Sequence, residues 1–145
     1  MIEFEKIYGL GDLDKFTKEI LSFIGDGGII LLRGNLASGK TAFAKAFAKA
    51  IGLLEDVSSP SFSVLNEYDN RFFHYDVYQG GLSGFLQNGL FEKLEESGYH
   101  LIEWAGEDFE RALSSLGIGY STIDIEVQKE KRIYKVKINA HSEGS

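Results

Sequence analysis

Residues 28–41 read GIILLRGNLASGKT, and the architecture of the protein can be inferred from this segment. Residues 28–32 form a short apolar, β-branched run, as expected of a buried parallel strand. Residues 34–41 match the pattern G-x-x-x-x-G-K-T, and the alanine-rich segment that follows them has helical spacing. A strand, a glycine-rich loop and a helix in this order predict a loop that binds the phosphates of a nucleotide.

The residue types of this loop suit the chemistry of a triphosphate. Gly34 and Gly39 lack a Cβ, so the chain can wrap tightly and turn its backbone N–H groups toward phosphate oxygens. Lys40 can reach the β- and γ-phosphates, and the hydroxyl of Thr41 can coordinate a Mg²⁺ that bridges phosphate oxygens. We therefore expect a nucleoside triphosphate and Mg²⁺ at this loop.

Composition and charge narrow the remaining classes of protein. The 145 residues are enough for one domain with its own core, and the absence of cysteine removes zinc-ribbon and thiol-redox sites. The net charge of −7 argues against broad electrostatic docking on nucleic acid. No signal-peptide pattern and no bilayer-length apolar run are present, so we expect a soluble, cytoplasmic protein. The basic stretch at residues 129–137 is interpreted as the solvated face of a hairpin.

Strands and helices are predicted to alternate around the loop. The periodicity predicts strands at residues 2–7, 28–32, 63–68, 71–75, 100–103, 121–127 and 132–138, helices at 13–24, 41–51 and 107–116, and a partly helical segment at 80–97. Asp12 is placed to cap the first helix, Phe43 and Phe47 share an apolar stripe, and Asp69 and Asn70 predict a hairpin turn. We expect residues 1–145 to form a single-domain, three-layer α/β fold of the P-loop NTPase type with a mixed central sheet.

Two acidic residues stand where such a sheet gathers its ligands, at the carboxyl ends of strands. Asp76 follows the strand at 71–75, and Glu103 ends the strand at 100–103. Either residue would hold a metal or orient a water, and the alternative for each is an ordinary surface acid. His74 is interpreted as a structural residue, with proton transfer as the alternative. Trp104 either packs in the core, or it positions the acid before it or meets a partner.

After the phosphate loop the chain carries residues 57–62 (VSSPSF), 74–78 (HYDVY) and 101–104 (LIEW). In order and spacing, these four segments resemble the bacterial TsaE (YjeE) family, and the resemblance spans nearly the whole chain. It implies a small P-loop ATPase that acts with the TsaB and TsaD proteins to make threonylcarbamoyladenosine in tRNA. Because the net charge is −7, we expect contact with tRNA to be indirect.

The resemblance implies roles for individual residues. The ATP phosphates would be bound through Gly34, Asn35, Leu36, Ala37, Ser38, Gly39, Lys40, Thr41 and Ala42. Thr41 and Glu103 would hold Mg²⁺, and Asp76 would support the metal or the attacking water, so Lys40, Asp76 and Glu103 are the predicted catalytic residues. Arg132 matches an arginine near the nucleotide, and Leu10 is a weaker match to a base contact. Ser59, Pro60, Ser61 and Phe62 match a switch loop, and Trp104 is expected to act with them or to meet a partner.

The chain departs from the family pattern at a few positions. Asn35 and Ala37 stand where the family commonly has aspartate and glycine, and neither change removes a phosphate-binding N–H or the lysine. Ser61 replaces a threonine and keeps the hydroxyl, and Ala105 replaces a proline. These departures bear on loop geometry and rate more than on the class of activity.

Other nucleotide-binding classes remain as alternatives. A small-molecule P-loop kinase usually carries a lid with clustered arginines, whereas this chain has four scattered ones. A GTPase usually carries N-K-x-D to read guanine, which is absent here. A third alternative is a nucleotide-gated binding module, in which ATP sets the shape of residues 58–62. This alternative is compatible with the resemblance to the TsaE family. The scarcity of arginine predicts slow turnover by the chain alone and completion of the site by a partner.

Overall fold

The computed structural model describes residues 2–35, 39–54, 57 and 64–138. In chain order its elements are β1 (Ile2–Tyr8), the 3₁₀ turn η1 (Leu10–Asp12), α1 (Leu13–Ile24), β2 (Gly28–Arg33), α2 (Lys40–Ala50), β3 (Leu65–Tyr68), β4 (Phe72–Asp76), α3 (Gly81–Gln87), α4 (Leu90–Lys93), β5 (Tyr99–Glu103), α5 (Glu107–Ser115), β6 (Ser121–Gln128) and β7 (Lys131–Ile138). Apart from η1, which is not predicted from the sequence, these elements agree in type with the predicted ones, and residue 63 of the predicted strand 63–68 lies outside the described residues. None of the described helices is long and apolar enough to cross a bilayer.

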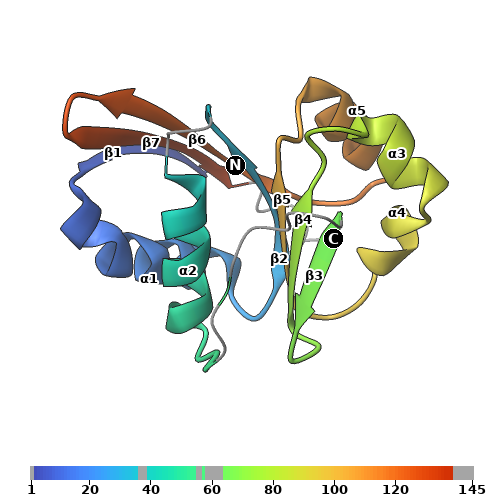
Figure 1. Cartoon of the computed structure of the whole chain (residues 1–145), viewed down its shortest axis with the longest axis horizontal. Helices are drawn as coiled ribbons and strands as arrows, with labels where there is room; N and C mark the ends of the chain where they lie inside the picture. The colour runs from blue at the N-terminus through green and yellow to red at the C-terminus, as the bar shows by residue number, and fades with distance from the viewer. Residues whose placement is uncertain (1, 36–38, 55–56, 58–63, 139–145) are drawn as a thin grey trace.

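The strands form one mixed sheet in the order β1-β7-β6-β2-β5-β4-β3. The four central strands β6, β2, β5 and β4 run parallel, whereas β7, β1 and β3 pair antiparallel at the two sides. Helices α1 and α2 cover one face of the sheet, and α3, α4 and α5 cover the other (Figure 1). The predicted three-layer α/β fold with a mixed sheet is confirmed.

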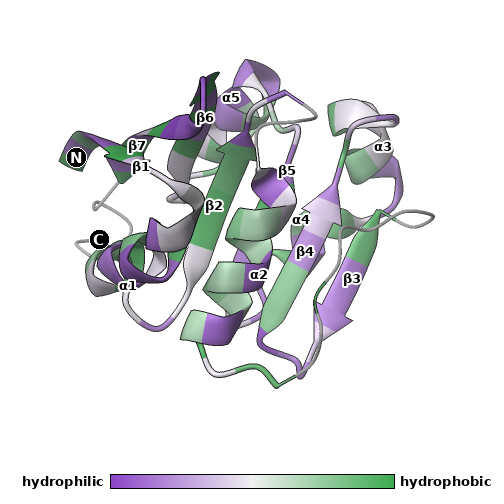
Figure 2. Cartoon of the chain, turned by 60° about the vertical axis from the view of Figure 1, so that its left-hand side comes forward, coloured by the Kyte–Doolittle hydropathy of each residue, from purple (hydrophilic) through white to green (hydrophobic). Residues whose placement is uncertain are grey.

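Strand β2 supplies the centre of both hydrophobic cores. Ile30 and Leu32 belong to the core under α1 and α2, whereas Ile29 and Leu31 belong to the core under α3 and α5. Successive side chains of a strand point to opposite faces, so an uninterrupted apolar run fits only a strand that is covered on both sides. Figure 2 shows β2 coloured largely as hydrophobic in the middle of the sheet.

Two local predictions are confirmed by the backbone and by burial. Asp69 and Asn70 have φ of 53° and 52°, the left-handed conformation that a two-residue turn between β3 and β4 requires. Phe43 and Phe47 are fully buried on the inner face of α2. These phenylalanines therefore belong to the core and carry no chemistry.

Asp12 occupies the predicted N-cap position of α1. Its side chain, however, makes no capping hydrogen bond to that helix. Its Oδ2 instead accepts a hydrogen bond of 3.1 Å from the N–H of Gly9. The physical reason is that η1 directly precedes α1, so the carboxylate closes the 3₁₀ turn rather than the helix after it.

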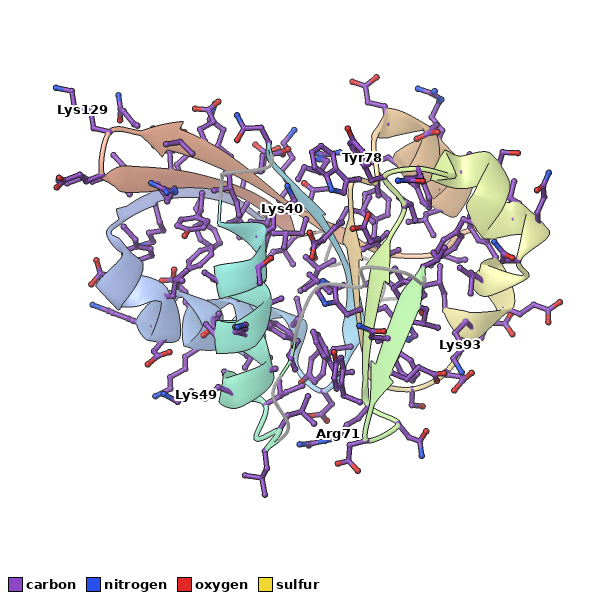
Figure 3. The ribbon with its side chains drawn as sticks, viewed as in Figure 1. Lys40, Lys49, Arg71, Tyr78, Lys93 and Lys129 are labelled. Carbon is purple, nitrogen blue, oxygen red and sulfur yellow. The ribbon has the colours of Figure 1, made fainter. Side chains whose placement is uncertain are left out.

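The basic stretch near the end of the chain lies on the β6–β7 hairpin, as predicted. Lys131, Lys135 and Lys137 are exposed, and Nζ of Lys135 donates to Oε1 of Glu126 at 3.0 Å. Lys129 lies at the tip of the hairpin, far from the loop that precedes α2 (Figure 3). These lysines form a solvated strand face.

Candidate functional site

The carboxyl ends of the central strands bring the predicted acidic residues beside the phosphate loop. Glu103 ends β5 and pairs in register with Leu32 of β2 and with Asp76, the last residue of β4. Paired residues of neighbouring strands lie on the same face of a sheet, and the face of Leu32 is the one covered by α2. Lys40 opens α2 directly after the loop that leaves β2. The fold therefore gathers Lys40, Asp76 and Glu103 at one edge.

The side chain of Lys40 folds back over the loop. Its Nζ donates to the backbone carbonyls of Gly34 at 2.6 Å and Asn35 at 3.0 Å. The same Nζ lies 4.0 Å from the centroid of the Trp104 ring. These partners are two neutral carbonyls and an indole face, and an ammonium group can exchange such partners for phosphate oxygens, which carry charge.

Burial and charge act in opposite directions on Lys40. The residue is 5% exposed, and burial lowers the pKa of its ammonium group. The negative charges of Glu103 and Asp76 act against this decrease in the Lys40 pKa. The two carboxylates are therefore close enough to Lys40 to influence it electrostatically.

Gly39 has a backbone conformation that side chains rarely adopt, with φ of 104°, and it is the N-cap residue of α2. Its carbonyl accepts the hydrogen bond from the N–H of Phe43 at 3.0 Å. A Cβ at Gly39 would lie 3.9 Å from Nε of Arg132, so the guanidinium group of β7 borders the loop. Contact of Arg132 with a nucleotide stays a prediction.

Glu103 is held by a buried histidine. His74 in β4 is fully buried, and its Nε2 is hydrogen-bonded to Oε2 of Glu103, which is itself 3% exposed. The burial of His74 agrees with its interpretation as a structural residue. Its partner, however, is a predicted catalytic acid rather than a neutral core group.

Asp76 and Trp104 are fixed by short contacts in the loops that follow β4 and β5. Oδ1 of Asp76 accepts a hydrogen bond of 2.9 Å from the N–H of Tyr78, and the Tyr78 and Trp104 rings lie 4.7 Å apart. Trp104 has φ of 72°, a strained conformation for a bulky residue. In Figure 3 Lys40 and Tyr78 lie toward the same end of the sheet, and Arg71 lies at the opposite end. Trp104 is therefore half-buried beside the site and does not lie wholly in the hydrophobic core.

The residues present suit a metal ion that arrives with a nucleotide. Thr41 is exposed in the first turn of α2. Across residues 2–35, 39–54, 57 and 64–138, no group of three or more acidic, histidine or cysteine side chains could hold a metal ion. Mg²⁺ usually takes one or two carboxylates and completes its shell with phosphate oxygens and water. Thr41, Glu103 and Asp76 fit that pattern better than a site made of protein ligands alone.

Sequence reasoning misses an ion-pair network directly before the loop. Arg33, the last residue of β2, donates to both carboxylate oxygens of Asp124 at 2.9 and 3.0 Å and to Glu110 at 2.5 Å. Burial alone would lower the pKa of Arg33, but the hydrogen bonds and charges of Asp124 and Glu110 together raise it. The only sequence signal for this network is the arginine at the end of an apolar strand. The spacing of residues does not identify Asp124 and Glu110 as its partners.

Several predicted residues lie where the structure permits little or no description. Leu36, Ala37 and Ser38 of the loop, and Ser59, Pro60, Ser61 and Phe62 of the predicted switch, lie outside the described residues. Leu10 begins η1, and Ala42 lies in the first turn of α2. The roles of all these residues stay predictions.

Comparison with known proteins identifies the family. The family model described as "Threonylcarbamoyl adenosine biosynthesis protein TsaE" matches residues 9–137. The chain belongs to the TsaE family. The match includes the phosphate loop and the segments around His74 and Glu103, so the resemblance inferred from these motifs is confirmed.

Curated TsaE proteins are similar to this chain at moderate identity. The protein from Treponema pallidum is 36% identical over 105 residues, which cover 70% of this chain and 75% of the relative. The protein from Bacillus subtilis is 35% identical over 93 residues, covering 61% of this chain and 58% of the relative. Both are named as tRNA threonylcarbamoyladenosine biosynthesis proteins.

A solved structure supports the fold of this TsaE chain. The crystal structure of Bacillus subtilis YdiB superposes with a TM-score of 0.68 and covers 97% of this chain and 88% of its own. The sequence identity in this superposition is 22%, so the likeness concerns the fold.

Proposed function

We propose that this TsaE protein binds ATP with Mg²⁺ and hydrolyses it slowly to ADP and phosphate. It would do so in the synthesis of threonylcarbamoyladenosine in tRNA, together with the TsaB and TsaD proteins. The observation that carries the proposal is the gathering of Lys40, Asp76 and Glu103 at the carboxyl edge of the parallel strands, beside a phosphate loop. Because the net charge is −7, tRNA would be reached through the partners.

Lys40 is the group that would recognise the phosphates. Its Nζ would leave the carbonyls of Gly34 and Asn35 and donate to the β- and γ-phosphate oxygens. Trp104 packs against the same ammonium group and excludes water from one side of it. A cation in such a partly dry site stabilises developing negative charge more strongly than a cation in bulk water does.

The two carboxylates would serve the metal and the attacking water. Mg²⁺, when bound, neutralises charge on the transferring phosphoryl group. Thr41 and Glu103 would hold it, and Asp76 would support it or orient a water for in-line attack. The hydrogen bond from the N–H of Tyr78 already fixes one oxygen of Asp76, which favours a defined orientation of this carboxylate.

The positions of the arginines support slow turnover by the chain alone. Arg71 pairs with Asp69 at the far end of the sheet (Figure 3), and Arg111 is an exposed residue of α5. Arg33 is occupied by its network, whereas Arg132 borders the loop at Gly39. An arginine supplied by a partner is worth about 10³- to 10⁵-fold in rate. Equal turnover with and without purified TsaB and TsaD would contradict this part of the proposal.

Two experiments separate the alternatives. Release of phosphate from ATP without a phosphorylated acceptor would exclude a small-molecule kinase.

A Glu103→Gln variant tests the nucleotide-gated module, because it keeps the shape of the side chain and removes its charge. If this variant binds ATP, fails to hydrolyse it and still supports repeated rounds of tRNA modification, ATP acts only as a gate.

The nucleotide site itself is tested by a matched pair of lysine variants on α2. We expect Lys40→Ala to weaken binding of ATP·Mg²⁺, measured by calorimetry, by roughly 10- to 100-fold or more, because a charge-assisted contact to phosphate is lost. Lys45→Ala removes an exposed lysine of the same helix and should leave the affinity unchanged. Retained affinity in folded Lys40→Ala, or no binding by the wild type, would refute the proposal.

A further inference from the structure

His74 is a polar group that the core would not otherwise need. Its ring is fully buried, and Phe72, two residues earlier on the same strand face, lies with its ring 6.0 Å away. Nε2 is hydrogen-bonded to Oε2 of Glu103, whereas Nδ1 has no hydrogen-bond partner among the residues that the structure describes. Burying an imidazole with one nitrogen unsatisfied is unfavourable, so an apolar residue would suit the core better. The hydrogen bond to Glu103 is therefore the interaction that requires a polar side chain at position 74.

The chemistry of this contact determines which nitrogen of His74 carries the proton. A carboxylate oxygen only accepts, so the Nε2 of His74 carries a proton and donates it. The hydrogen bond fixes Oε2 of Glu103. The other oxygen, Oε1, makes no side-chain hydrogen bond with any residue that the structure describes.

We propose that His74 is a positioning residue of the metal site: its hydrogen bond orients the Glu103 carboxylate and leaves Oε1 for Mg²⁺. The inference rests on the proposed function, because it concerns how the metal is held beside the nucleotide. Partners that hold a metal-binding side chain typically contribute about 10- to 100-fold to metal affinity or activity. His74 would exert this effect without touching the nucleotide.

A second buried histidine shows what a purely structural histidine looks like in this sheet. His100 in β5 lies on the opposite face, where its Nδ1 accepts from the hydroxyl of Tyr75 at 2.6 Å and its Nε2 donates to the carbonyl of Glu96 at 2.8 Å. Both of its nitrogens are used, and neither contacts Lys40, Asp76 or Glu103. His100 therefore provides a matched control for His74.

The test measures how strongly Mg²⁺ promotes nucleotide binding, without relying on turnover. Trp104 is the only tryptophan and adjoins Glu103, so its fluorescence can follow titrations with ADP. The readout is the Kd for ADP in EDTA divided by the Kd for ADP in excess Mg²⁺. We expect His74→Met to lower this ratio by about 10- to 100-fold, or to one, while the Kd in EDTA stays within about twofold.

Two further variants separate positioning from packing. His74→Gln supplies an amide N–H that can replace Nε2–H, so it should keep most of the wild-type ratio. His100→Gln should keep the wild-type ratio even where it lowers thermal stability. A folded His74→Met variant with the wild-type ratio would overturn the inference and leave the proposed function intact. Failure of wild-type protein to bind ADP would instead refute the proposed function, and the inference would fall with it.

A measurement on the wild type covers the case in which His74→Met does not fold. Nitrogen-15 NMR of the histidine rings should assign the Nε2–H form to His74, with a shift of this resonance when Mg²⁺ is added to the ADP complex. The Nδ1–H form, or a resonance that Mg²⁺ leaves unchanged, would overturn the inference.

Discussion

Nζ of Lys40 lies 4.0 Å from the centroid of the Trp104 ring, so the only tryptophan of the chain packs against the ammonium group of the phosphate loop. Such a cation–π contact contributes about 0.5–2 kcal/mol, depending on how far it is desolvated. Trp104 also follows Glu103 directly and keeps a positive φ, which persists only where the surroundings hold it. The indole therefore lies next to both the proposed phosphate ligand and the proposed metal ligand.

This contact predicts a fluorescence signal for nucleotide binding. If Lys40 moves from its loop carbonyls to phosphate oxygens, the environment of Trp104 changes, so its emission should shift or change in intensity when ADP is added. Lys40→Met should abolish the change at the same ADP concentration, whereas Lys45→Met should preserve it. Unchanged emission at nucleotide concentrations that calorimetry shows to be saturating would contradict the prediction.

Asp76 allows its charge to be separated from its hydrogen bond. Asp76→Asn keeps an oxygen that can accept from the N–H of Tyr78, so its free energy of unfolding should stay within about 0.5 kcal/mol of the wild type. Its ATP hydrolysis should fall about tenfold or more, because the charge that supports the metal or water is lost. Asp76→Ala should lose the hydrogen bond as well, at a further cost of about 0.5–1.5 kcal/mol. Urea unfolding and phosphate release measure the two effects, and wild-type turnover in Asp76→Asn would exclude Asp76 from the reaction.

The Arg33 network should stabilise the fold through its planar fork. Lysine keeps the charge but cannot donate to both oxygens of Asp124 and to Glu110 in the same geometry. We expect Arg33→Lys to lower the free energy of unfolding, measured by urea unfolding, by about 1–3 kcal/mol. Arg111→Lys is the control, since Arg111 is exposed and its contact with Glu107 is 3.9 Å long, so the change should stay within about 0.5 kcal/mol. Equal effects of the two substitutions would show that the fork adds no stability.

His100 should make the stability of the protein depend on pH. Burial lowers the pKa of His100 below its ordinary value, against smaller opposing effects of the backbone and charge of Glu96. As the pH falls below about 6.5, the unfolded chain binds a proton at His100 before the folded chain does, so the folded state loses stability. The loss is at most about 1.4 kcal/mol per pH unit, and it is absent above the ordinary pKa.

The measurement is urea unfolding between about pH 7 and pH 5. His100→Gln removes the titrating ring, so its stability should fall less steeply over this range than that of the wild type. Parallel profiles for the two proteins would mean that His100 contributes nothing to the pH dependence.

The local structure of this protein can be inferred from its sequence. The apolar run of β2, the glycines around the loop and the spacing of α2 predict a strand, a phosphate loop and a helix, because each depends on backbone periodicity or on φ at single residues. The turn at Asp69 and Asn70 follows from the same local chemistry. That Asp76 and Glu103 end strands was predictable for the same reason.

Which of these elements lie side by side depends on the packing of the whole fold. Whether β5 lies between β2 and β4 depends on how every strand and helix packs, and this order makes Asp76 and Glu103 neighbours. The contact of His74 with Glu103 spans 29 residues, and that of Arg33 with Asp124 spans 91. Sequence spacing carries no signal over such separations, because pairing and register are set by burying both faces of the sheet at once.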